Sequence, residues 1–340
     1  MCSSDLRVCH SDLVQYAMIV PNPVYTLSDY LPAFAPVYDQ GEYLDDLKKN
    51  LESSGIKTLR FNPFVPVLSL AMNNRDHRKI LVVDGHTAFN GGINLADEYI
   101  NEISVHGYWK DTGVRHRGDA VWNFTAMFLE FWHAYRPESA EEPIDLFHPH
   151  TYHPEPFEGK GWVQPFSDSP IDGEAVSASV YADILAQAKN YVYIYTPYLI
   201  IDDVLQSAIC AAAKRGVDVR IVTPGKPDKK IVYRMTQSYY EPLLRAGVRI
   251  FEYEPGFIHA KSYLADDIMG VIGTINMDYR SLYLHFECGS YFYRSPVLDE
   301  LKADVMDTLS KCREVTIADC QRHFWSRLLD AVLRIAAPLC

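Results

Sequence analysis

The sequence has few features of a disulfide-built, metal-binding or membrane-spanning protein. Its seven cysteines are scattered, and no two of them form a CxxC pair, which fits reduced thiols better than a disulfide framework or a zinc site. No stretch approaches the roughly 20 apolar residues that cross a bilayer. No basic segment followed by a long apolar core indicates a signal peptide. These absences predict a soluble chain with reduced thiols.

Positive charge is also in short supply. The 340 residues include 32 Lys and Arg against 44 Asp and Glu, for a net charge of −12. Proteins that mainly bind nucleic acid usually carry a basic balance, so we expect no nucleic-acid partner, although an acidic balance is also ordinary for a cytosolic protein. The length and a hydrophobic content of 48% leave room for two packed domains.

The sequence contains one short polar pattern written twice. The first copy consists of His77, Lys79, Asp84, Gly91, Gly92 and Asn94, and the second of His259, Lys261, Asp266, Gly273, Thr274 and Asn276. Each of the six pairs is separated by 182 residues. A long-period repeat indicates a duplicated structural unit. Because the matched residues are polar, whereas a packing constraint would favour apolar ones, the two halves are predicted to build one site together.

The residue types in this pattern suit a phosphodiester. A His and a Lys two residues apart on a strand lie on the same face. Two such pairs would give two lysines for the non-bridging oxygens, one imidazole that attacks phosphorus and one that protonates the departing oxygen. The small residues would let the backbone approach the phosphate, and the asparagines would add neutral donors. A metal site is the competing interpretation, but the lysines would repel a cation, so we expect no metal.

The rest of the chain alternates between strand and helix patterns, which implies α/β layers. Strands are predicted at Lys57–Phe61, Ile80–Val83, Thr112–Arg117, Tyr191–Leu199, Asp218–Thr223, Arg249–Tyr253, Ser262–Ala265 and Gly289–Tyr293. Helices are predicted at Glu42–Ser53, Ala120–Tyr135, Val180–Lys189, Asp203–Lys214, Lys230–Arg245 and Val297–Ser310.

Composition divides the chain into unequal halves. Residues 136–160 are proline-rich and acidic, as linkers often are, which predicts a first lobe over 1–135, a linker over 136–160 and a second lobe over 161–322. Residues 323–340 are predicted to form an amphipathic helix that either lies in a membrane interface or packs on the second lobe. The strands predicted at 191–199 and 218–223 have no convincing counterpart before His77. We therefore expect a reduced or irregular sheet in the first lobe.

The repeated HxKxxxxD, followed by GGxN or GTxN, resembles the phospholipase D superfamily. The segments NNRDHRKILVVDG, GYWKDTGVR, VYIYTPYLIIDD and GTINMDYRSLYLHFECG are similar to those of bacterial cardiolipin synthases. The resemblance implies two phospholipase D-like lobes, each a mixed β-sheet flanked by helices, related by a pseudo-two-fold axis and sharing one active site. It also implies the joining of two phosphatidylglycerol molecules into cardiolipin with release of glycerol, without a metal or other cofactor.

The resemblance assigns roles by matching position. His77 would be the nucleophile that forms a phosphatidyl-histidine, and His259 the acid and then the base, although the near symmetry leaves the reverse assignment open. Asp111 and Glu287 would each orient the histidine of the other half.

The resemblance also implies a location in the cell. The sequence departs from the family's pattern at one point. Asp84 and Asp266 would support the fold of the site rather than touch substrate. The chain would work on an anionic membrane surface, at the cytoplasmic face of the cell membrane. The family usually begins with two membrane helices that this sequence lacks, so an N-terminally truncated form is expected. A phosphodiester hydrolase (a phospholipase or a nuclease) and an inactive remnant stay open as alternatives.

Overall fold

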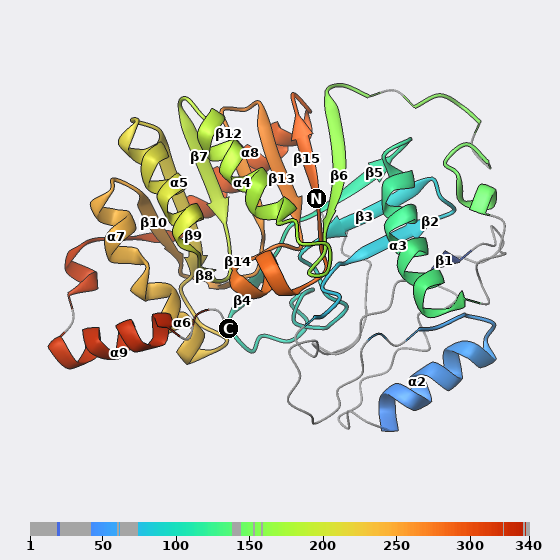
Figure 1. The fold of residues 1–340 in the computed structure, drawn as a ribbon, viewed down its shortest axis with the longest axis horizontal. Coiled ribbons are helices and arrows are strands. Elements are labelled where there is room, and N and C mark those ends of the chain that lie inside the picture. Colours follow the sequence, from blue (N-terminus) through green and yellow to red (C-terminus); the bar gives the residue numbers. More distant parts are fainter. Residues whose placement is uncertain are drawn as a thin grey trace.

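The computed structural model of the protein describes residues 19–20, 42–59, 61, 74–137, 144–151, 154–157, 159–321, 323–335 and 337. The described strands form a sheet of four strands, a sheet of eight strands and two short pairs, and helices cover the sheet faces (Figure 1). The α/β class with helix-flanked sheets, which the resemblance predicted, is confirmed. None of the described helices is long and apolar enough to cross a membrane.

The smaller sheet carries the first copy of the repeated pattern. Its strands, in spatial order, are β1 (Ile19–Val20), β2 (Ile80–Val83), β3 (Thr87–Gly91) and β5 (Gly113–Arg117). β2, β3 and β5 are antiparallel neighbours, whereas β1 joins β2 in parallel. Helix α3 (Val121–Tyr135) packs Val121 and Phe124 onto this sheet against Val82 and Ala88. A further helix, α2 (Glu42–Ser53), precedes the sheet strands β2 to β5 along the chain.

The larger sheet carries the second copy. Its strands, in spatial order, are β16 (Cys312–Val315), β10 (Arg249–Tyr253), β9 (Asp218–Pro224), β7 (Tyr191–Tyr195), β12 (Ser262–Ala265), β13 (Met269–Gly273), β15 (Glu287–Tyr293) and β6 (Trp162–Asp168). The neighbours β10, β9 and β7 are parallel, and the other pairs are antiparallel. Every residue of β12 and β13 is buried, so the strands that follow His259 lie in the core.

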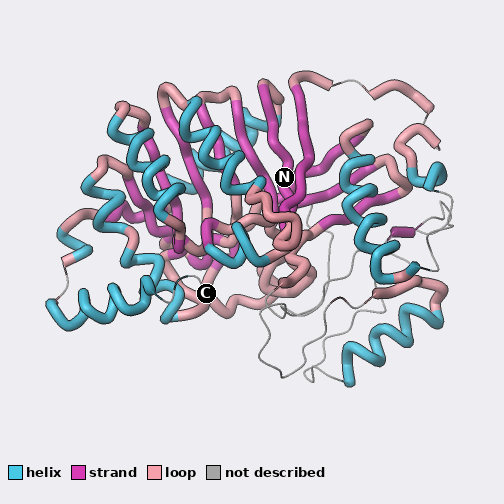
Figure 2. The backbone as a smooth tube through the Cα atoms, viewed as in Figure 1, coloured by secondary structure: helices cyan, strands magenta, loops and turns pink. Residues whose placement is uncertain are grey.

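Helices stand on both faces of the larger sheet, which gives three layers (Figure 2). One face is covered by α4 (Val176–Gln187), α5 (Asp203–Lys214), α6 (Lys230–Ser238) and α7 (Tyr240–Arg245), and the other by α8 (Val297–Leu309). The last helix, α9 (Phe324–Ile335), packs on α6, where Arg234 donates to the Asp330 carboxylate at 2.8 Å. Helix α9 thus contacts the second half of the chain, and the two alternatives for residues 323–340 as a whole stay predictions.

Short elements complete the described part of the chain. They are β4 (Tyr108–Lys110), η4 (Ile144–Phe147), β8 (Leu199–Ile200), β11 (Gly256–Ile258), β14 (Met277–Asp278), the π-helical η5 (Arg280–Leu284) and η6 (Ala318–Cys320). β4 pairs with β11 in parallel, so a strand of the first half lies beside the second half. The turn η4 falls within the predicted linker, and the lobe boundaries themselves stay a prediction.

Three sequence predictions need correction. Lys57–Phe61 is not a strand, because its described residues have no regular structure and the place beside β2 is taken by β1. The single helix predicted over Lys230–Arg245 is two helices, since Pro242 cannot donate the backbone hydrogen bond that would continue α6. Pro197 likewise divides the predicted strand Tyr191–Leu199 into β7 and β8.

The reduced first sheet matches expectation as far as the described residues go. β1, of two residues, is parallel to β2, whereas β7 is antiparallel to β12. β1 therefore occupies the place of β7 without being its structural counterpart. The strands that do correspond, β2 with β12 and β3 with β13, are offset by the 182 residues of the repeat.

Candidate active site

The two histidines enter the site through matching backbone contacts between the halves. The backbone N–H of His259 donates to the carbonyl of Lys110 at 2.7 Å, next to the β4–β11 pair. The N–H of His77 donates to the carbonyl of Phe286 at 2.9 Å, next to a parallel bridge between Asp76 and Phe286. Each histidine is thus held by the strand segment that leads to a carboxylate of the other half.

That carboxylate contacts the imidazole directly. The Nδ1 of His77 lies 2.9 and 3.0 Å from the two carboxylate oxygens of Glu287, and the Nδ1 of His259 lies 2.7 Å from Oδ2 of Asp111. An ionised carboxylate only accepts hydrogen bonds, so Nδ1 carries the proton in both rings. The lone pair is then on Nε2, which is the nitrogen that can attack or accept a proton.

The two segments that carry these carboxylates are related by a second constant offset in the sequence. Asp111 and Glu287 are 176 residues apart, as are Thr112 and Cys288. The N–H of Gly92 donates to Thr112 at 3.0 Å, and the N–H of Thr274 donates to Cys288 at 2.9 Å. The repeat is therefore longer than the six-residue pattern suggests, but its register changes between the pattern and the carboxylate.

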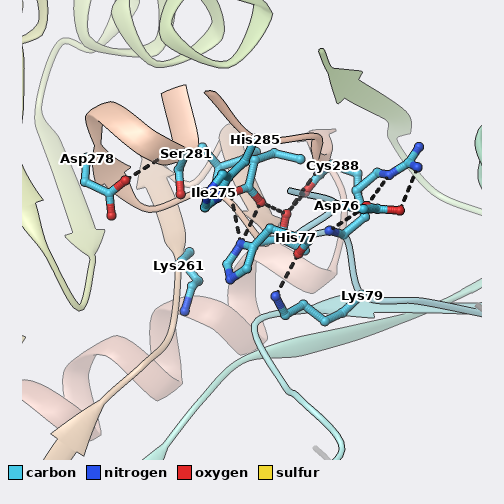
Figure 3. A network of polar contacts seen from close by, with 12 residues as sticks. Asp76, His77, Lys79, Lys261, Ile275, Asp278, Ser281, His285 and Cys288 are labelled. Carbon is cyan, nitrogen blue, oxygen red and sulfur yellow. Dashed lines mark hydrogen bonds and ion pairs between the residues drawn. The ribbon is translucent and has the colours of Figure 1, made fainter. Parts of the chain in front are cut away.

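The two lysines lie beside the histidines of their own strands. Lys79 Nζ donates to the His77 carbonyl at 2.7 Å, and Lys261 Nζ donates to the His259 carbonyl. Figure 3 shows Lys79 and Lys261 on either side of the His77 ring. Burial lowers the pKa of Lys79 to about 8 and that of Lys261 to about 7, although Glu287 and Asp111 oppose this effect. A bound anion would favour the charged form of both amines.

Burial also determines the protonation of the two histidine–carboxylate pairs, called here the dyads. It lowers the pKa of His77 to about 4 and that of His259 to about 3, more than the neighbouring carboxylates raise them. Burial alone would raise the pKa values of Glu287 and Asp111, but the charge and hydrogen bond of the partner histidine bring both below their usual range. Near neutral pH the free site thus contains neutral imidazoles and ionised carboxylates.

Comparison with known proteins agrees with this geometry. Residues 181–308 match the family described as cardiolipin synthase, PLD-like domain. The chain is 36% identical over 293 residues to a cardiolipin synthase of Alkalihalophilus pseudofirmus, covering 86% of this chain and 58% of the relative. It is also 36% identical over 296 residues to a cardiolipin synthase of Geobacillus kaustophilus, with the same coverage of 86% and 58%. Residues 181–308 thus match a phospholipase D-like domain, and the chain is similar to cardiolipin synthases over 86% of its length.

Two further matches bear on the fold and on length. A Streptococcus mutans protein of uncharacterised function is 50% identical over 295 residues, which cover 86% of this chain and 63% of that protein. The chain thus spans about three-fifths of the length of these relatives. A phosphatidylserine synthase structure from Haemophilus influenzae superposes with a TM-score of 0.58 at 15% identity, covering 78% of this chain and 70% of that one, which supports the phospholipase D fold.

The remaining polar residues of the repeated phospholipase D pattern lie in two places. Thr274 donates its hydroxyl hydrogen to Glu287, and Asn94 donates from Nδ2 to the Tyr99 hydroxyl at 2.5 Å. Oδ1 of Asn276 is buried and has no hydrogen-bond partner among the described residues. These side chains border the dyads and leave one amide oxygen without a partner.

Asp84 and Asp266 lie away from the dyads, in identical turns with φ of 54°. The Asp266 carboxylate accepts backbone N–H groups of Lys189, Asn190 and Tyr191 at 2.7 to 2.9 Å. In the second half this position ties β12 to the start of β7. These contacts would let Asp266 support the fold, and that role stays a prediction for both aspartates.

Gly91 and Gly273 have a structural role that the sequence alone does not reveal. A Cβ at Gly91 would lie 2.4 Å from the carbonyl oxygen of Thr112, and one at Gly273 would lie 2.6 Å from that of Cys288. The expectation that these two residues make room for phosphate is therefore incomplete. They make room first for the neighbouring strand, β5 or β15, that leads from the carboxylate.

Three site residues were missed by the sequence analysis. The ring of His285 lies 5.5 Å from the His77 ring, with Nδ1 3.6 Å from Glu287, and neither ring nitrogen has a hydrogen-bond partner among the described residues. Trp109 and Tyr99 place their rings 5.4 and 5.2 Å from His259. Applying the offset of 176 to the sequence would have paired Trp109 with His285.

His77, His285 and Glu287 are also the described residues that could hold a metal, with ligand atoms within 4.8 Å of one another. Two imidazoles and a carboxylate suit zinc. However, Glu287 already binds His77 and Thr274, and Lys79 and Lys261 add positive charge nearby. The arrangement fits an anion better than a cation, and a metal-free site stays a prediction.

Proposed function

We propose that this protein transfers a phosphatidyl group from one phosphatidylglycerol molecule to another, releasing glycerol and producing cardiolipin. The observation that carries the proposal is the pair of crossed histidine–carboxylate contacts, flanked by a lysine from each half. The similarity to cardiolipin synthases supports the choice of substrate. The proposed place of action is an anionic membrane surface at the cytoplasmic face of the cell membrane.

In the first step, Nε2 of His77 attacks phosphorus and the bond from phosphorus to the glycerol oxygen breaks. Glu287 stabilises the positive charge that develops on the His77 ring. Lys79 and Lys261 hold the non-bridging oxygens. His259 gives its proton to the departing glycerol oxygen, which leaves a phosphatidyl group on His77.

This step requires a protonated His259, although burial keeps it neutral in the free site. Binding of the phosphodiester would itself favour the protonated form of His259. Its negative charge raises the pKa of a nearby histidine, most strongly where water is excluded. Substrate binding and protonation of His259 are therefore coupled in the proposed mechanism.

In the second step, His259 takes a proton from a glycerol hydroxyl of the second phosphatidylglycerol. The oxygen forms a bond to phosphorus, and the bond from phosphorus to His77 breaks, which restores the free histidine. Water in place of the second lipid would give phosphatidic acid instead, so the outcome depends on how well water is excluded from the intermediate.

The test is mass spectrometry of lipids after the protein is incubated with phosphatidylglycerol vesicles. We expect cardiolipin and free glycerol in equal amounts. Phosphatidic acid without cardiolipin would instead identify a hydrolase. Unchanged lipid, with a protein that is folded by circular dichroism, would identify an inactive chain.

A further inference from the structure

The connection between the repeated pattern and the carboxylate is longer in the first half. Sixteen residues separate Asn94 from Asp111, whereas ten separate Asn276 from Glu287. In the second half this connection contains β14 and the π-helical turn η5. In the first half it contains a loop over residues 95–107, called here the site loop, followed by β4. The longer of the two connections is thus the one that borders His259, through Tyr99 and Trp109.

The base of the site loop is part of the active-site wall. Asn101 fastens it, since its Nδ2 donates to the Trp109 carbonyl at 3.0 Å and its Oδ1 accepts the Trp109 N–H at 2.7 Å. Within the loop, the Tyr99 ring lies 4.5 Å from the Trp109 ring and 5.2 Å from that of His259. A movement of this loop would therefore be felt at the catalytic imidazole.

The outer part of the site loop presents apolar side chains to solvent. Ile103 is 41% exposed and Val105 is 63% exposed, and Leu95 and Tyr108 at the two ends are also exposed. Ile103 and Val105, two residues apart on one short loop, offer apolar surface that contact with another apolar phase would cover. Ile103 and Val105 lie in a loop, outside the helices and strands that form the hydrophobic core.

A basic segment adjoins the site loop. Lys226, Lys229 and Lys230 are exposed and follow β9, and Lys229 lies 3.8 Å from the carboxylate of Asp228 in the same segment. Lys226 donates to the carbonyl of Pro255 at 3.4 Å, and the same carbonyl accepts the N–H of Tyr108 at 3.1 Å. The two segments therefore meet at one backbone group, although the site loop itself adds an exposed Glu102.

We propose that the site loop inserts Ile103 and Val105 into an anionic lipid surface, with Lys226, Lys229 and Lys230 on the headgroups. The choice of a lipid surface rests on the proposed function, because a phosphatidyl substrate leaves its acyl chains in the bilayer while its phosphate enters the site. Apolar side chains flanked by lysines match the interior and the charge of such a surface. The same loop that borders His259 would then bring the site to the membrane.

The test is flotation of the 340-residue chain with vesicles of phosphatidylglycerol and phosphatidylcholine. The variant Ile103→Glu/Val105→Glu should bind about tenfold more weakly or worse, since two apolar groups no longer leave water. The matched control is Ile171→Glu/Val204→Glu, because these residues are 75% and 68% exposed and lie on other segments. It adds the same charge and should bind like the parent protein.

A further arm of the test uses charge. Changing Lys226, Lys229 and Lys230 to Gln should weaken vesicle binding about fivefold per lysine and reduce its dependence on phosphatidylglycerol. Vesicle binding is measured without turnover, so it tests the loop even if no cardiolipin is made.

Two results would overturn the proposal. Equal vesicle binding by the site-loop variant and the parent protein would show that the loop does not meet lipid. An equal loss of vesicle binding in the control variant would show a general charge effect.

Discussion

The surroundings of His77 and of His259, called here the two half-sites, have matching backbone contacts and the same pair of His and Lys. The side chains around each pair differ. Glu287 receives a hydrogen bond from Thr274 and has His285 beside it, whereas Asp111 faces Gly92, and Trp109 stands where His285 would be. A Cβ at Gly92 would lie 2.2 Å from Asp111, so a threonine does not fit there without a shift. The duplicated scaffold thus supports two different chemical environments.

This difference separates two histidines that the repeat makes look equal. The His77 side chain is 22% exposed and has polar neighbours, while the His259 side chain is 9% exposed and lies among the rings of Tyr99, Trp109 and Phe257. Two titratable groups in different environments can take different acid–base roles. The comparison therefore supports distinct roles for the two histidines.

The largest expected effect comes from removing either imidazole. His77→Asn and His259→Asn should each lower cardiolipin formation by on the order of 10⁴-fold or more, because the dyads act as one unit. With an activated leaving group, which needs no acid, only His259→Asn should recover a first step. Rates of leaving-group release from both variants measure this difference. Recovery by His77→Asn alone would exchange the two roles.

The carboxylates should come next. Glu287→Gln and Asp111→Asn keep the shape of each His–carboxylate pair, but the neutral amide can donate to Nδ1 and so impose the other tautomer, and it does not stabilise an imidazolium. Each variant should therefore lower turnover by about 10²- to 10⁴-fold. The measurement is kcat at saturating vesicle concentration. An unchanged kcat in either variant would show that its crossed contact does not serve catalysis.

A smaller effect is expected from the neighbours that differ between the half-sites. His285→Asn should lower kcat/KM by at most about tenfold, because it removes a ring nitrogen 3.6 Å from Glu287 while the hydrogen bond between His77 and Glu287 remains. The matched change Trp109→Phe keeps an aromatic ring beside His259 and should cost less. A loss in His285→Asn as large as that in Glu287→Gln would place His285 within the catalytic dyad.

The smallest effect concerns stability and pH. Burial holds the pKa of His77 at about 4 and that of His259 at about 3, below the usual 6.5. The unfolded chain therefore binds protons that the folded chain does not, and stability present above pH 6.5 is lost as the pH falls toward 4 and then 3. The melting temperature (Tm) of the parent protein should fall more steeply with decreasing pH over this range than the Tm of the His77→Asn/His259→Asn variant. Parallel curves would contradict the assignment of neutral, buried imidazoles.

Much of this site could be predicted from the sequence, because the repeat records it directly. The 182-residue register identified the histidines and lysines, and the resemblance identified the crossed carboxylates Asp111 and Glu287. His285, Trp109 and Tyr99 were missed because the register changes by six residues before the carboxylates. The need for Gly91 and Gly273 was also hidden, since it depends on how closely a neighbouring strand passes.

The fold was predicted less well where tertiary contacts decide. Pro197 and Pro242 were visible in the sequence, yet whether a proline ends an element depends on the place it occupies within that element. The pattern at 57–61 favours a strand, but a strand forms only where a neighbour offers hydrogen bonds. In the described part of the first half, β2 is paired with β1 and β3 instead.

The central claim, that the two half-sites form one active centre in which one histidine carries the lipid, has a direct test. The protein is mixed briefly with phosphatidylglycerol, denatured under conditions that preserve phosphohistidine, and digested for mass spectrometry. A phosphatidyl group on the peptide containing His77, absent in His77→Asn and retained in His259→Asn, is the predicted result. Cardiolipin formation with no adduct on either histidine would contradict the account.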